Sequence, residues 1–181
     1  MKRVFLGFDL SKEIKTDIEQ LKLRHRLDKL PIKLVEPKNS HIAVKFLGQL
    51  DDLQIKQVIK AVESTTKNNG QLQATIGNGI MFPNNYSPRV LALTITGHDL
   101  IDFAKRIILA LNQLPFITKE DRKFTPHITL GRIKEELKKS EIKKLQRIEY
   151  KQLTSFNRLQ LFESQLSSAG PVYTALNNFD L

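Results

Sequence analysis

Two short segments of this 181-residue chain repeat one pattern about half the chain length apart. Residues 41–44 (HIAV) and 127–130 (HITL) each place a histidine at the head of an apolar run. Each run continues to a glycine, Gly48 or Gly131, and then to a charged helical segment. Recurrence in the same local context indicates an internal duplication. We therefore expect two similar lobes that face each other, and not a regular alternation of parallel strands and helices.

Hydrophobic periodicity predicts the elements around these segments. Strands are expected over 3–10, 32–37, 41–50, 72–82, 89–95, 123–133, 156–164 and 172–179. Helices are expected after a Ser11 cap, from Asp51 or Asp52, around Ile101–Leu111, and over about 136–148. This order favours an α+β fold. We expect residues 1–181 to form a single bilobal domain, with two pseudo-symmetric lobes of mostly antiparallel sheet, helices outside and a central cleft.

Strand alternation predicts what surrounds each histidine. His41, Ala43 and Lys45 are expected on an open face, while the residues between them pack in the core together with Phe46. If pseudo-symmetry relates the lobes, the open faces of the two strands line one cleft. A histidine then approaches from each side.

In the second segment, Thr129 shares the face of His127 at roughly 7 Å, two strand positions away. This arrangement suits phosphodiester chemistry, because imidazoles titrate at ~6.5 and a pair supplies one general base and one general acid. The hydroxyl of Thr129 would donate to a non-bridging phosphate oxygen.

The four-residue pattern alone leaves other interpretations open. A histidine in a strand is often structural or simply exposed, which is our expectation for His25 and His98. A metal site is a further option, but no Cys, Asp or Glu stands at ligand spacing from the two strand histidines, so we expect no metal. The chain has no Cys, which excludes disulfides and a thiol nucleophile. It has no Walker-type or Gly-x-Gly-x-x-Gly loop, and we expect no cofactor.

Charge and hydropathy suggest the partner and the compartment. Lys and Arg total 29 against 19 Asp and Glu, a net charge of +10 that favours RNA or another anion, although a lysine-rich solvated surface explains the excess equally well. We expect no signal peptide, and the sequence has no apolar run of the ~20 residues that a membrane span needs. We expect a cytoplasmic monomer without a membrane partner.

At these residues the chain resembles the two-histidine phosphoesterases, and within them the RNA 2′,3′-cyclic phosphodiesterases, historically called 2′-5′ RNA ligases. The resemblance covers almost the full length, through coordinated segments in the right order. They are RVFLGFDLSKEI (3–14), VEPKNSHIAVKFLGQL (35–50), FPNNYSPRVLALTI (82–95), FTPHITLGRIK (124–134) and LQLFESQLSSAGPVYTAL (159–176).

The resemblance implies metal-independent opening of a 2′,3′-cyclic phosphate of RNA or a nucleotide to leave a 2′-phosphate. It implies that His41 is the acid that protonates the 3′ oxygen and that His127 is the base that activates water. Thr129 matches the phosphate-binding threonine of the family. Arg132 matches a basic residue that often follows, although strict alternation puts it on the face opposite Thr129.

Ala43 departs from the family, which usually carries Thr or Ser at this motif position. One hydroxyl contact to the phosphate is lost, and Lys45, on the expected open face, is a substitute candidate. The departure keeps an alternative open, namely an RNA-binding module with weak or lost turnover. A reversible 2′-5′ RNA ligase is a third hypothesis, but hydrolysis should dominate in water.

Overall fold

A computed structural model describes residues 1–67, 69–119, 124–168 and 170–181. Within them it contains nine strands, four α-helices and two short 3₁₀ turns. In chain order these are β1 (Lys2–Asp9), α1 (Lys12–Arg24), η1 (Leu27–Lys29), β2 (Ile32–Leu34), η2 (Pro37–Asn39), β3 (His41–Leu50), α2 (Asp52–Thr66), β4 (Leu72–Phe82), β5 (Val90–Thr96), α3 (His98–Leu111), β6 (His127–Ile133), α4 (Lys139–Leu145), β7 (Gln152–Phe156), β8 (Arg158–Ser167) and β9 (Gly170–Asp180).

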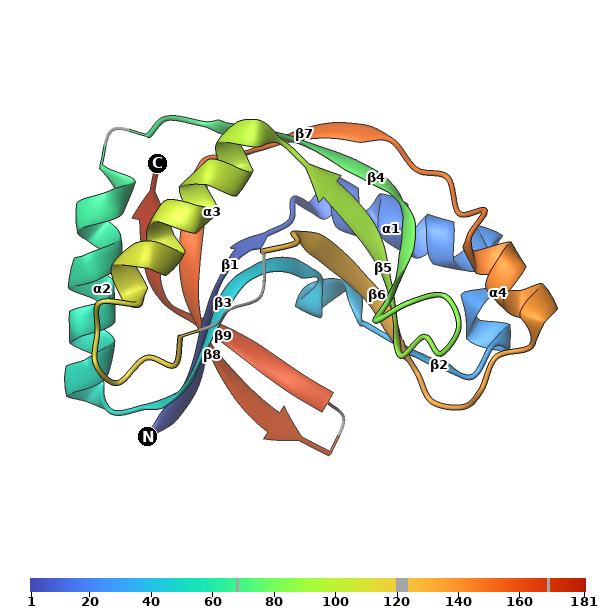
Figure 1. The fold of residues 1–181 in the computed structure, drawn as a ribbon, viewed down its shortest axis with the longest axis horizontal. Helices are drawn as coiled ribbons and strands as arrows, with labels where there is room; N and C mark the ends of the chain where they lie inside the picture. Colours follow the sequence, from blue (N-terminus) through green and yellow to red (C-terminus); the bar gives the residue numbers. More distant parts are fainter. Residues whose placement is uncertain (68, 120–123, 169) are drawn as a thin grey trace.

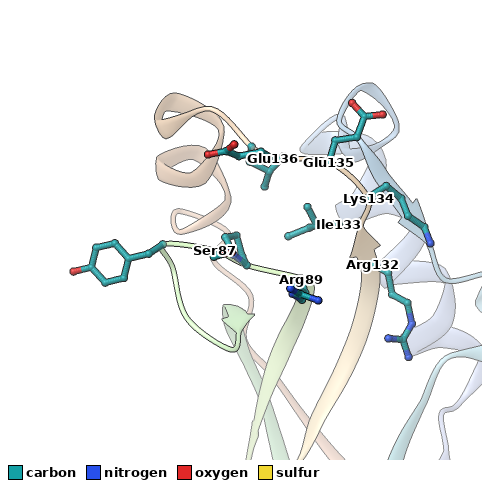
Figure 2. Close-up of a pocket in the computed structure, with 10 residues that line it drawn as sticks. Ser87, Arg89, Arg132, Ile133, Lys134, Glu135 and Glu136 are labelled. Atoms are coloured by element: carbon teal, nitrogen blue, oxygen red, sulfur yellow. The ribbon is translucent and has the colours of Figure 1, made fainter.

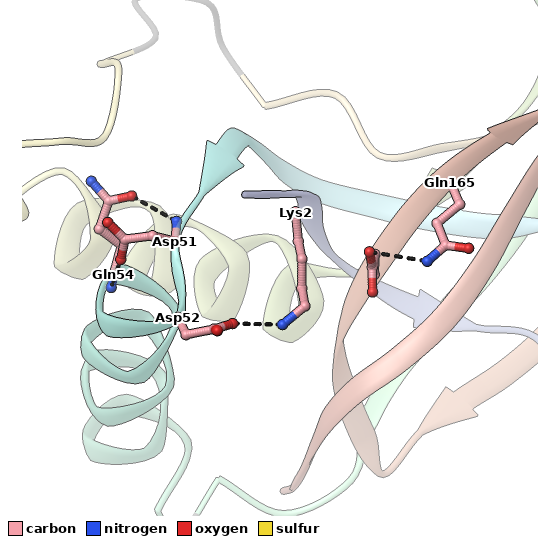
Figure 3. Close-up of polar contacts among 6 residues, drawn as sticks. Lys2, Asp51, Asp52, Gln54 and Gln165 are labelled. Carbon is pink, nitrogen blue, oxygen red and sulfur yellow. Dashed lines mark hydrogen bonds and ion pairs between the residues drawn. The ribbon is translucent and has the colours of Figure 1, made fainter.

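The first two helices begin at the side-chain caps that the sequence predicts. The Ser11 hydroxyl accepts a hydrogen bond from the Ile14 N–H at 3.3 Å at the start of α1. At the start of α2, the Asp51 carboxylate accepts from the Gln54 N–H at 2.8 Å, and the Gln54 side chain accepts from the Asp51 N–H at 3.0 Å (Figure 3). These contacts satisfy backbone N–H groups that the first helical turn leaves without partners.

The strands form one antiparallel sheet, and the strands of its two halves correspond to each other. The nine-stranded sheet has the order β7-β4-β5-β6-β3-β1-β8-β9, with β2 also paired to β6, and its pairs are antiparallel. Reading outward from the centre, β3 corresponds to β6, β1 to β5, β8 to β4 and β9 to β7. The predicted pseudo-symmetric, antiparallel α+β fold is therefore confirmed.

The helices lie outside the curled sheet in two pairs (Figure 1). The α2 and α3 helices contact each other, and α2 also contacts β9 while α3 contacts β3 and β4. Figure 1 shows α1 and α4 together on the other side, near β4, β5 and β6. Side chains such as Ile18, Val58 and Phe103 are fully buried between the helices and the sheet. Each contributes roughly 1.5–3 kcal/mol of burial free energy. Because the helices cover the outer face of the sheet, the other face of the central strands stays open.

Some element boundaries differ from the expected ones. The strand predicted over 32–37 ends at Leu34, and Pro37 instead opens the η2 turn. The strand predicted over 123–133 begins at His127, after Pro126, whose nitrogen cannot donate to a sheet, and residue 123 lies outside the described residues. The helix expected over about 136–148 is confined to α4, and β7 was not expected at all.

Candidate active site

The two histidine-headed strands meet at the centre of the sheet. The contact between β3 and β6 is the antiparallel pair Ile42–Ile128. The antiparallel direction places His41 across from Thr129 and Ala43 across from His127, on the open face. We call these four residues the crossing quartet.

Both imidazoles are held in the same way. The Nδ1–H of His41 donates to the carbonyl of Asn39 at 2.7 Å, and the Nδ1–H of His127 donates to the carbonyl of Thr125 at 2.8 Å. A carbonyl oxygen only accepts, so these bonds fix the proton on Nδ1 in the neutral ring. The Nε2 atom of each histidine is thereby the one left for proton transfer.

Aromatic rings pack against each histidine. The ring centroid of Phe5 lies 4.8 Å from that of His41, and Tyr173 meets the same imidazole edge-on at 5.1 Å. On the other side of the crossing, Phe82 lies 4.9 Å from His127. These contacts restrict the orientation of both imidazoles and exclude water from part of their surface.

A hollow of about 230 Å³ adjoins His41. Its walls include Phe5, Phe162 and Tyr173, and Gln160 and Lys38 provide polar groups. Burial lowers the pKa of the His41 imidazole below its ordinary value, whereas its bond to the Asn39 carbonyl and the Asp9 carboxylate act in the opposite direction. A nearby anionic phosphodiester would also favour the protonated form.

A β-bulge interrupts alternation at the same place in both strands. In β3, Lys45 pairs with Leu6 and Ala43 with Gly7, so Val44 is the extra residue. In β6, Gly131 pairs with Leu91 and Thr129 with Ala92, so Leu130 is the extra residue. Each bulge shifts the following side chains to the opposite face from that given by simple alternation.

The expected position of Lys45 is therefore wrong. Its side chain is on the helix-facing side of the sheet, only 2% exposed, and its ammonium donates to the Thr118 carbonyl at 3.2 Å. Phe46, expected in the core, is on the open face and 59% exposed. Because the bulge at Val44 reverses both positions, Lys45 does not join the crossing quartet and does not replace the hydroxyl that Ala43 lacks.

The same effect moves Arg132 to the open face, where strict alternation did not place it. Arg132 pairs with Val90 and Thr129 with Ala92, two positions apart on β5, so both side chains emerge on one side. Gly131 takes the place that Lys45 has in the first lobe. A Cβ at Gly131 would lie 2.5 Å from the Ile32 side chain, because β2 packs there.

The other two histidines lie on the helices and not at the crossing. His25 caps the C-terminal end of α1, and His98 begins α3 with its side chain 88% exposed. Across the described ranges there is no group of three or more His, Asp or Glu side chains placed to hold a metal ion. In the same residues no helix is long and apolar enough to cross a membrane.

Several residues of the site were not found from the sequence. Phe5 and Tyr173 join His41 from β1 and β9, which only the sheet order brings together. Asn39 holds His41 through its carbonyl, and its buried side-chain amide donates to the Pro171 carbonyl at 2.9 Å. The Asn39 side chain thus ties the turn before His41 to β9, and no local sequence pattern predicts that contact.

Comparison with known proteins of similar sequence and similar fold identifies the family. The model of the LigT-like phosphoesterases matches residues 8–92 and 101–173. The RNA 2′,3′-cyclic phosphodiesterase of Aquifex aeolicus is 32% identical over 99% of this chain and 97% of its own, and that of Methanocaldococcus jannaschii is 30% identical over 98% and 99%. Crystalline E. coli LigT, solved with 3′-AMP, has the same fold, with a TM-score of 0.84, 21% identity, and coverage of 99% of this chain and 98% of its own. The chain belongs to the LigT-like phosphoesterases.

Proposed function

We propose that this phosphoesterase hydrolyses the 2′,3′-cyclic phosphate at RNA ends to a 2′-phosphate, with His41 as general acid and His127 as general base. The observation that carries the proposal is the matched pair of imidazoles, each anchored through Nδ1–H to a backbone carbonyl. Both rings then keep Nε2 for proton transfer on the shared open face. The relatives from Aquifex aeolicus and Methanocaldococcus jannaschii are RNA 2′,3′-cyclic phosphodiesterases, which supports the substrate.

The reaction needs one neutral and one protonated imidazole. Nε2 of neutral His127 takes a proton from water, and the oxygen of that water attacks phosphorus. The bond from phosphorus to O3′ breaks on the opposite side, and Nε2–H of protonated His41 transfers its proton to O3′. The products are a 3′-hydroxyl and a 2′-phosphate. The two histidines end with exchanged protonation states, which solvent restores.

The surroundings of His41 support this direction. In an in-line displacement the leaving O3′ and its ribose lie on the side of the acid, away from the attacking water. The hollow of about 230 Å³ adjoins His41, and its aromatic walls suit a nucleoside. Burial, which lowers the pKa of His41, also makes the imidazolium a stronger proton donor.

One hydroxyl group and one guanidinium group would hold the phosphate. Thr129 stands across from His41 and donates its hydroxyl to a non-bridging oxygen. Arg132 emerges on the same face two register positions further along and neutralises charge. Hydrogen bonds of this kind strengthen as negative charge grows in the transition state. This arrangement needs no metal ion, and we propose a metal-independent reaction.

The test is turnover of RNA that ends in a 2′,3′-cyclic phosphate, with identification of the product isomer. We expect only the 2′-phosphate. His41→Ala and His127→Ala should each lower the rate about 10²–10⁴-fold. His25→Ala and His98→Ala are the matched histidine controls and should retain activity. Near-normal turnover by either folded crossing variant would overturn the mechanism.

A second candidate function, an RNA-binding module without useful turnover, is favoured by one observation. Ala43 leaves one side of the crossing without a hydroxyl. This candidate predicts RNA binding with no product, and it predicts that both histidine variants bind as the wild type does. The same turnover assay therefore separates the two candidates.

A further inference from the structure

A second and larger hollow lies outside the crossing quartet. Its volume is about 570 Å³, and it lies between the β4–β5 loop and the segment that follows β6 (Figure 2). We call it the outer hollow. The residues that matter for its chemistry are Tyr86, Arg89, Arg132, Lys134, Glu135 and Glu136.

Backbone hydrogen bonds hold its cationic side chains on fixed supports. The Arg89 N–H donates to the Phe82 carbonyl at 2.7 Å, and the Arg89 carbonyl accepts from the Ile133 N–H at 2.9 Å. The Lys134 N–H donates to the Pro31 carbonyl at 2.8 Å. Arg89 and Lys134 therefore project from the ends of ordered strands and not from a free loop.

The three cations of the outer hollow have no acidic partner in the part of the chain that the structure describes. No ion pair or side-chain hydrogen bond there involves Arg89, Arg132 or Lys134. Two carboxylates also line the hollow, but Figure 2 shows Glu135 and Glu136 at the end away from Arg89 and Arg132. Unpaired guanidinium and ammonium groups on a concave surface attract phosphate.

An aromatic side chain accompanies these cations. Tyr86 is 94% exposed, although burial would stabilise a ring of this size. Its loop is nevertheless ordered, because the Asn84 side chain accepts from the Tyr86 N–H at 2.9 Å and from the Ser87 N–H at 3.0 Å. An exposed ring and unpaired cations that line one hollow are the combination that binds single-stranded nucleic acid, by stacking on bases and neutralising phosphates.

The outer hollow is continuous with the catalytic face through Arg132. Arg132 lines the outer hollow and also lies on the open face with Thr129. Thr129 stands across from His41, and Arg132 lies further along β6 in the direction away from His127, so Arg132 is on the His41 side of the crossing. The outer hollow therefore opens on the His41 side of the crossing.

The ribose of the cyclic end also lies on that side in the reaction proposed above, so the chain 5′ of it leaves there. We propose that the outer hollow binds the single-stranded RNA immediately 5′ of the cyclic end, with Arg89 and Lys134 on its phosphates and Tyr86 stacked on a base. This inference rests on the proposed function. It makes the substrate class an RNA end, because a free cyclic mononucleotide does not reach these residues.

The test compares two substrates, 2′,3′-cyclic AMP and an RNA tetranucleotide with a 2′,3′-cyclic end. The variants are Arg89→Ala combined with Lys134→Ala, Tyr86→Ala, and Tyr86→Phe, which keeps the stacking ring. Arg147→Ala combined with Lys60→Ala removes the same charge from exposed helix-side positions and is the matched control. All should retain the wild-type circular dichroism spectrum.

We expect the outer-hollow substitutions to change the kinetics of the tetranucleotide alone. Tyr86→Ala should raise the KM for the tetranucleotide roughly 5- to 150-fold, the effect expected from the loss of one stacked base. Tyr86→Phe should behave as the wild type. The double cation variant should also reduce the salt dependence of tetranucleotide binding by about one phosphate contact for each cation removed. Hydrolysis of 2′,3′-cyclic AMP should not change.

Two outcomes would overturn the inference. In one, the control pair of substitutions weakens binding of the tetranucleotide as much as the outer-hollow pair does, which would mean that only net charge matters. In the other, both substrates respond equally to every variant. Binding of the tetranucleotide with a terminal 2′-phosphate, followed by fluorescence anisotropy, needs no turnover. If that binding depends on Arg89 and Lys134 while no substrate is hydrolysed, the proposed function fails and the binding site stands.

Discussion

Ala43 lies across from His127 where β3 crosses β6, whereas Thr129 occupies the matching place across from His41. The backbone of the crossing is pseudo-symmetric, and both strands even bulge at the fourth motif position. The side chains are not symmetric. One hydroxyl remains, and it stands beside the proposed acid, while the side of the proposed base has only a methyl group. The chemistry of the phosphate site should therefore depend heavily on Thr129.

Restoring the second hydroxyl should increase the rate. Ala43→Thr places an O–H donor next to His127, where it can bond a non-bridging oxygen as charge builds. We expect kcat/KM to rise by up to about tenfold, which corresponds to ~1.4 kcal/mol. Ala43→Val has nearly the shape of Thr without the hydroxyl and should give no gain. An equal gain from both variants would mean that the side-chain volume acts and not the hydroxyl.

Removing the remaining hydroxyl should be costly for the same reason. Thr129→Val keeps the β-branched shape and deletes the donor. Loss of one oriented donor costs about 2.7–4 kcal/mol, roughly 10²–10³ in kcat. In an Ala43→Thr background the loss should be smaller, because a second donor then holds the phosphate. A harmless Thr129→Val in the wild-type background would direct attention to Arg132 as the main phosphate ligand.

The bulges predict opposite results for two cationic residues. Arg132 is on the open face and Lys45 is buried on the other face, with its ammonium on the Thr118 carbonyl. Arg132→Met should lower kcat/KM by the value of a charged hydrogen bond, about 1.5–3 kcal/mol or roughly 10- to 150-fold. Lys45→Met should leave kcat/KM unchanged and alter only the free energy of unfolding. Steady-state kinetics with matched denaturant melts would reveal whether these assignments are interchanged.

Much of this architecture follows from local pattern. The caps Ser11 and Asp51 and the strands headed by His41 and His127 can be predicted, because capping chemistry and apolar runs are encoded within a few residues. The short strand β7 was missed. Its sequence, QLTSF, is polar and alternates weakly, and it becomes a strand by pairing with β4 along Leu72–Ile76.

The faces of Lys45, Phe46 and Arg132 required the structure. A bulge depends on how two strands align, here Leu6–Gly7 against β3 and Leu91–Ala92 against β6, and a period-two argument cannot include an extra residue. The approach of Tyr173 to His41 is similarly non-local, since it comes from β9 through the sheet order. Sequence reasoning thus identified the motif residues but not their aromatic neighbours.

Chelation should not affect turnover. The proposed proton transfers use imidazoles, and the phosphate charge is met by Thr129 and Arg132. We expect hydrolysis of cyclic-ended RNA to proceed at the same rate before and after dialysis against EDTA. The informative control is addition of zinc, manganese or magnesium to the dialysed enzyme. Loss of activity that one of these ions restores would require a metal-dependent mechanism.

Stability should fall as the pH decreases through the range in which histidines titrate. Burial lowers the pKa values of His41 and His25 below the ordinary 6.5. As the pH falls below about 6.5, the unfolded chain binds protons at these positions before the folded chain does, so the free energy of unfolding decreases until the lower, folded pKa values are passed. Each histidine contributes a slope of at most about 1.4 kcal/mol per pH unit.

Urea melts from pH 7.5 to 5 should show this loss, and His41→Gln and His25→Gln should each reduce it. Because the two residues lie in different parts of the fold, the double variant should combine both reductions. A wild-type slope in His41→Gln would contradict the inference that this imidazole is held neutral by burial in the free enzyme.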